Sequence, residues 1–157
     1  MSDAFARRVT RVSGCAGYKL GEQLTLHPTG LTREQFRRLA EFADQGGALS
    51  VGDLLAEVQR HLSATAAAFE RNSLVNVRLA QAIADTIARI TIEWDALPPA
   101  ARNWLAGAIL YFTKCQDDIP DFSSPIGFED DVEVLNACLR FARRPELCLK
   151  PEEYDGA

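Results

Sequence analysis

The sequence predicts an all-α fold, a single-domain bundle of about six helices that spans residues 1–157. Apolar residues recur at helical spacing along most of the chain, with little competition from other patterns. Helix-starting residues and glycine or proline breaks interrupt this pattern at short intervals. With 157 residues, 47% hydrophobic and 25% charged, the chain is long enough to bury one core without disulfides or structural metals.

The N-terminal third begins with a weak pattern and then a strong one. A short amphipathic helix is predicted near residues 5–12, and the glycine-broken segment 14–30 is predicted to be a loop. Thr32 and Gln35 have the spacing of a capping box, in which each side chain satisfies a free backbone amide of the other residue. The sequence therefore predicts a helix that begins after Thr32 and ends at the glycine pair 46–47.

The middle of the chain carries two long apolar stripes. Ser50 is the predicted N-cap of a helix whose stripe runs over residues 51–69. A second stripe runs over residues 79–94. A new helix could begin at residue 72 or 73, or both residues could lie within one longer helix.

Prolines divide the C-terminal third. The pair Pro98-Pro99 is typical of a first helical turn, and the helix that follows is predicted to end before Pro120. A last main helix is predicted over residues 132–142, and residues 151–157 are predicted to form a frayed acidic tail.

Composition argues against several classes of function. A net charge of −5 argues against a nucleic-acid partner, because phosphates are neutralised by clustered positive charge. The N-terminus lacks the apolar core of a signal peptide, which predicts a cytoplasmic protein. The longest apolar stretch, residues 104–112, is about half of the ~20 residues that span a bilayer, so membrane association is not expected. The four cysteines form no Cys-x-x-Cys pair, which favours free thiols over a zinc site.

One acidic segment near the C-terminus could bind a ligand. Six carboxylates lie close together between two apolar helices: Asp117, Asp118, Asp121, Glu129, Asp130 and Asp131. The spacing Asp-Asp-x-x-Asp occurs in enzymes that bind magnesium diphosphates, but Pro120 breaks the helical geometry that this chemistry needs.

Two further interpretations of the segment stay open. The four residues Asp117, Asp121, Asp130 and Asp131 could hold a divalent cation such as magnesium or calcium, because hard cations prefer several oxygen ligands. Alternatively the acids are structural: Asp121 and Asp130 would be N-caps, and the acids of residues 129–133 would be stabilised by the positive end of a helix dipole. Asp117 would pair with an arginine such as Arg102 or Arg140.

The same region resembles a known family. Leu97-Pro98-Pro99, Tyr111-Phe112, Ile119-Pro120-Asp121-Phe122, Ile126-Gly127-Phe128 and Asp130-Asp131-Val132 are similar to the pattern of the YkvA-like bacterial domain of unknown function. The resemblance covers residues 97–142 and implies a helix–loop–helix unit. It implies that the signature positions are Asp117, Pro120, Asp121, Gly127, Asp130 and Asp131. This sequence departs from the pattern at Cys115, where the family has proline, and at Asp118, where it has leucine.

No nucleophile–base pair is evident, and we therefore expect no catalytic residues and no cofactor. The apolar helical faces and the acidic segment predict a non-enzymatic module that binds a protein partner or a second copy of itself. The alternative function is that of a divalent-metal-binding protein or metal-dependent enzyme that uses the acidic-segment carboxylates.

Overall fold

A computed structural model describes residues 26–114 and 128–154. All regular structure in these residues is helical, which confirms the predicted all-α bundle. The elements are α3 (Arg33–Gly46), α4 (Val51–Arg71), α5 (Val77–Ile92), η1 (Trp94–Ala96), α6 (Pro99–Thr113), α7 (Glu129–Phe141), η2 (Pro145–Leu147) and η3 (Pro151–Tyr154). The predictions for residues 5–12 and for most of 14–30 lie outside the described residues.

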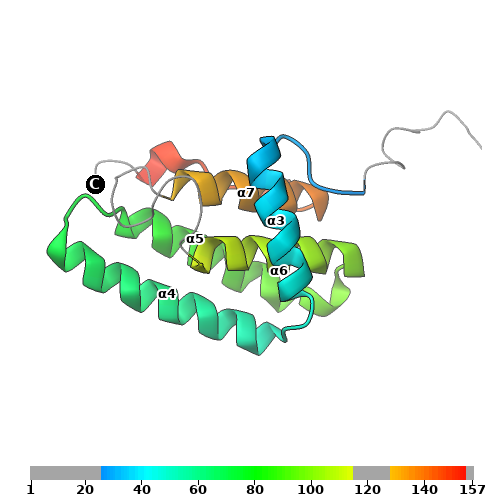
Figure 1. Cartoon of the computed structure of the whole chain (residues 1–157), viewed down its shortest axis with the longest axis horizontal. Coiled ribbons are helices and arrows are strands. Elements are labelled where there is room, and N and C mark those ends of the chain that lie inside the picture. Colours follow the sequence, from blue (N-terminus) through cyan, green and yellow to red (C-terminus); the bar gives the residue numbers. More distant parts are fainter. Residues whose placement is uncertain (1–25, 115–127, 155–157) are drawn as a thin grey trace, which may run out of the picture.

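Helix α6 forms the centre of the bundle. It contacts α3, α4 and α7, while α5 packs against α4. Figure 1 shows α4 to α7 lying roughly along one direction, with α3 laid across α6. Every residue of α6 from Leu105 to Phe112 is buried, as expected for a helix that is apolar on all sides.

Three predicted helix starts are confirmed, those of α3, α4 and α6. Thr32 Oγ1 accepts a hydrogen bond from the Gln35 amide at 3.0 Å, and Gln35 Oε1 accepts one from the Thr32 amide at 2.9 Å. Ser50 caps α4, and α6 begins at Pro99. The open question at residues 72–73 is also answered: α4 ends at Arg71, and the side chain of Asn76 caps α5.

Helices α3 and α6 cross with their backbones nearly in contact. A Cβ atom on Gly107 would lie 2.9 Å from the backbone N and Cα atoms of Ala43. One on Gly46 would lie 2.9 Å from the Cβ atom of Ala106. Only small side chains allow this approach, so these positions determine how α3 sits on the bundle.

The C-terminus of α7 ends in a strained residue. Arg143 has φ 65°, in the left-handed region, and the Arg144 amide donates to the carbonyl of Leu139 at 2.8 Å. This is a Schellman motif with arginine at the position that usually holds glycine.

Replacing Arg143 by glycine is expected to raise the free energy of unfolding by about 0.5–1 kcal/mol, because glycine adopts a left-handed conformation without steric cost. Urea unfolding of both proteins measures the change. Arg140→Gly is the matched control: the same substitution within regular α7 geometry is expected to lower stability by about 1 kcal/mol. Destabilisation by both substitutions would contradict the prediction.

Candidate functional site

The structure describes only part of the predicted acidic site. Asp117, Pro120, Asp121 and Gly127 lie outside the described residues. Asp130 and Asp131 lie in the first turn of α7 and are only 5% and 2% exposed. The expectation that Asp130 is an N-cap is wrong, because the cap position of α7 is Phe128 and makes no side-chain capping bond.

Asp130 instead connects α7 to two other helices. Its Oδ2 atom accepts a hydrogen bond from the Tyr111 hydroxyl of α6 at 2.5 Å, and its Oδ1 atom accepts one from the Gln35 Nε2 group of α3. The same Nε2 group also donates to Glu133 Oε1 at 2.7 Å. Since the other end of the Gln35 amide closes the α3 capping box, one side chain joins the start of α3 to the start of α7.

This geometry bears on the predicted cation site. Successive helical residues point about 100° apart, so Asp130 and Asp131 do not face a single point on α7. Both oxygens of Asp130 already accept hydrogen bonds. Within residues 26–114 and 128–154, no group of three or more histidine, cysteine or acidic side chains is placed to hold a metal ion. A site built from Asp117, Asp121, Asp130 and Asp131 therefore stays a prediction.

His61 is part of the core. It is 4% exposed, and its ring packs edge-on against Phe112 at a centroid distance of 4.7 Å and against Phe128 at 6.2 Å. The histidine thus joins α4 to α6 and to the residue that precedes α7. Its position beside the apolar stripe of α4 was the sequence signal for such packing.

Cys138 and Cys148 are free thiols. Burial raises the pKa of the Cys138 thiol far above its usual value, and burial also raises the pKa of Cys148. The Cys138 thiol lies 3.4 Å from the carbonyl of Trp104. Because the thiolate is the nucleophilic form, these environments oppose nucleophilic chemistry at both residues.

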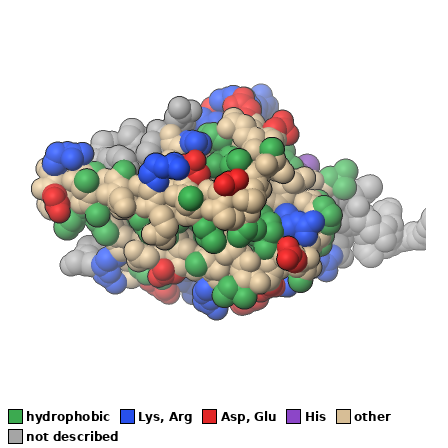
Figure 2. Space-filling view, turned by 90° about the horizontal axis from the view of Figure 1, so that it is seen from below, with side chains coloured by type: hydrophobic (Ala, Val, Ile, Leu, Met, Phe, Trp, Pro, Cys, Tyr) green, Lys and Arg blue, Asp and Glu red, His purple; other side chains and the backbone are tan. Residues whose placement is uncertain are grey.

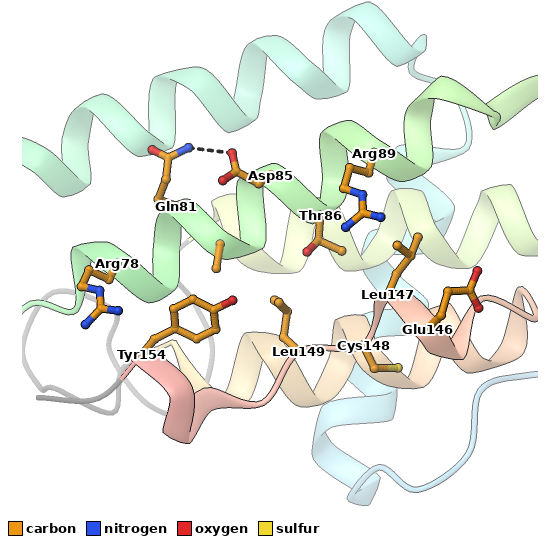
Figure 3. Close-up of a pocket in the computed structure, with 11 residues that line it drawn as sticks. Arg78, Gln81, Asp85, Thr86, Arg89, Glu146, Leu147, Cys148, Leu149 and Tyr154 are labelled. Carbon is orange, nitrogen blue, oxygen red and sulfur yellow. Dashed lines mark hydrogen bonds between the residues drawn. The ribbon is translucent and has the colours of Figure 1, made fainter. Parts of the chain in front are cut away.

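A pocket of about 400 Å³ opens between α5 and the segment 145–154. Figure 3 shows the side chains that α5 contributes, among them Arg78, Thr86 and Arg89, facing Leu147, Leu149 and Tyr154 across the gap. This site was not predicted from the sequence. The only trace of this pocket in the sequence is a row of polar residues at helical spacing on α5. The C-terminal segment that faces this row has no periodicity from which its fold could be predicted.

No family model, curated protein or solved structure matches the chain. The resemblance of residues 97–142 to the YkvA-like domain therefore stays a prediction. None of the helices in the described parts of the chain is long and apolar enough to cross a lipid bilayer.

Proposed function

We propose that this protein is a non-enzymatic interaction module that self-associates through the outer face of α4. The outer face is defined by two parallel rows on this helix. One is a row of small exposed residues: Gly52, Ala56, Ser63 and Ala67. The other is a flanking row of larger apolar residues: Leu55, Leu62 and Phe69.

Helix α4 uses its opposite face for the core. Its buried residues are Leu54, Val58, His61, Thr65 and Ala68, and they pack towards α5 and α6. Phe69 is 44% exposed, whereas Leu55 and Leu62 touch the core with part of their surface. Apolar side chains thus extend beyond what folding of one copy buries, which is typical of a surface that packs against a partner.

The spacing of the apolar row supports a second copy as the partner. Leu55 and Phe69 each lie seven residues from Leu62, so the row is symmetric about Leu62. A two-fold axis near Leu62 would place an antiparallel α4 against the first one, with Leu62 beside Leu62 and Leu55 beside Phe69. This symmetry is the observation that carries the proposal, because a two-fold interface must be complementary to itself.

The ends of α4 favour the same arrangement. Two antiparallel copies of α4 place each N-terminus beside the partner's C-terminus, so their dipoles align favourably. Figure 2, which views the molecule from the side on which α4 lies in Figure 1, shows hydrophobic and uncharged surface between separated charged groups.

The expected dimer is weak and reversible. One pair of 21-residue helices buries less than the roughly 1,200 Å² that is the lower end for stable interfaces. Sedimentation-velocity experiments from micromolar to millimolar concentration should therefore show a sedimentation coefficient that rises with concentration.

Ala56→Glu tests the interface. A long charged side chain in the row of small residues prevents the close approach of two helices, so we expect the dissociation constant to rise at least about tenfold, or ~1.4 kcal/mol. Ala64→Glu is the matched control, because Ala64 is exposed on the same helix but lies off the row. A monomeric wild type at millimolar concentration, or equal weakening by both variants, would reject the proposal.

A further inference from the structure

We propose that the pocket between α5 and the segment 145–154 binds an elongated organic anion with a carboxylate or phosphate group at each end. The proposal does not depend on self-association, because the pocket lies on α5 and the C-terminal segment rather than on the outer face of α4. Its volume of about 400 Å³ is within the range of small-molecule sites, roughly 300–1,000 Å³.

Two arginines supply the positive charge. Arg78 and Arg89 lie three helical turns apart on α5, and Figure 3 shows them at opposite ends of the pocket, on the side of α5 that faces the C-terminal segment. Neither forms an ion pair with any carboxylate of the described residues, whereas Arg144 pairs with Glu93 and Arg37 with Glu34. Guanidinium groups recognise carboxylates and phosphates through paired hydrogen bonds, so each end of the pocket suits one anionic group.

Thr86 is the second observation that points to a ligand. It is only 6% exposed and lines the pocket between the two arginines, about one helical turn from Arg89. Its hydroxyl makes no hydrogen bond to another residue within residues 26–114 and 128–154, and its oxygen is open to the pocket rather than sealed in the core. By contrast, the buried hydroxyl of Thr65 donates to the carbonyl of His61 at 2.8 Å. A polar atom on the ligand would satisfy the Thr86 hydroxyl.

Two carboxylates, those of Asp85 and Glu146, also line the pocket. Asp85 accepts a hydrogen bond from Gln81 at 2.9 Å, and Figure 3 shows this pair on the opposite edge of α5 from Arg78 and Thr86. In the same view Glu146 lies beyond Leu147, towards the Arg89 end of the pocket. The pocket is therefore bounded by the two guanidinium groups, the Thr86 hydroxyl, the Gln81 amide, the two carboxylates and apolar surface.

The segment 145–154, which forms the wall of the pocket opposite α5, is held in place by α7. Asn136 donates through Nδ2 to the carbonyl of Leu149 at 2.9 Å and accepts through Oδ1 from the Leu149 amide at 2.8 Å. Tyr154, in η3, folds back to the pocket rim beside Arg78. The apolar stems of Leu147 and Leu149 would contact the hydrocarbon part of a ligand whose ends reach the arginines.

Isothermal titration of the full chain with a length series of dicarboxylates tests the proposal. Succinate, adipate and suberate are the probes, with hexanoate as the singly charged comparison and inorganic phosphate as the compact anion. We expect affinity to peak at one chain length and to fall by about tenfold for hexanoate, because one arginine then has no partner. Binding of inorganic phosphate alone would overturn the elongated-ligand proposal.

Three variants locate the binding. Arg78→Met and Arg89→Met keep most of the side-chain length and are each expected to weaken the best dicarboxylate about tenfold. Arg33→Met, an exposed arginine on α3, is the matched control and should leave affinity unchanged. Equal weakening by the control would show non-specific charge attraction and reject the site.

Thr86→Val separates binding from folding. Valine has the same shape and removes the hydroxyl, so the melting temperature without probe should stay the same or rise, while dicarboxylate affinity falls about fivefold. A variant that loses stability and keeps its affinity would show that the hydroxyl serves the fold. The absence of any heat of binding for all probes at millimolar concentration would reject the proposal as a whole.

Discussion

Asp130→Ala is expected to lower the free energy of unfolding by about 3 kcal/mol, a large part of the roughly 5–15 kcal/mol available to a typical domain. The substitution leaves the buried Tyr111 hydroxyl without its 2.5 Å acceptor and removes one of the two acceptors of Gln35 Nε2. An unsatisfied buried donor loses its hydrogen bond to water and gains no replacement. Urea unfolding followed by circular dichroism measures the loss.

Two milder substitutions separate the contributions within this network. Tyr111→Phe removes one donor and leaves the Asp130 carboxylate bonded to Gln35, so a loss of about 1–2 kcal/mol is expected. Glu133→Ala removes an exposed acceptor and should cost under about 1 kcal/mol. If Asp130→Ala cost no more than Glu133→Ala, the network would not stabilise the fold.

The same experiment tests the alternative that the acidic residues bind a metal. Repeating the unfolding with EDTA and then with millimolar magnesium or calcium detects a ligand of the native state, because binding raises stability by mass action. The structural interpretation of Asp130 predicts the same loss of stability in every buffer. A cation-dependent gain in the wild type that Asp130→Ala abolishes would instead support a cation site.

Local features of the fold could be predicted from sequence because they depend on neighbouring residues. The capping box of Thr32 and Gln35 is visible as a spacing of three residues, and the start of α6 is visible in Pro98-Pro99. The bond from Gln35 to Asp130 joins residues 95 apart and has no local signal. The sequence therefore suggested that Asp130 was a helix cap or metal ligand, although in the fold it connects helices.

The pocket on α5 likewise could not be predicted from neighbouring residues in the sequence. The apolar stripe of α5 predicts which side is buried, but not that segment 145–154 returns to cover part of the polar side. That return depends on Asn136, whose amide pairs with the backbone of Leu149. A single asparagine in a helix is common and gives no sequence signal for such a contact. Spatial arrangement, rather than any motif, thus brings Arg78 and Tyr154 together.

Gly107→Val is expected to destabilise the fold by about 3 kcal/mol, at the upper end of typical overpacking effects. The new Cβ atom would lie 2.9 Å from backbone atoms of Ala43, and backbone atoms cannot change rotamer to make room. Helix α3 must therefore move off α6. Such a movement would also strain the bonds from Gln35 to Asp130 and Glu133, since these atoms lie at the other end of the same helix.

The chain contains its own control for this substitution. Gly52 lies in the first turn of α4, where an added Cβ atom would meet only the Ser50 hydroxyl, at an ordinary contact distance of 3.7 Å. Gly52→Ala should therefore raise stability by up to about 1 kcal/mol through helix propensity alone. Gly107→Ala gains the same propensity but introduces the clash, so a lower melting temperature for Gly107→Ala than for Gly52→Ala isolates the packing cost. Equal effects of the two alanines would show that α3 and α6 are not in close contact.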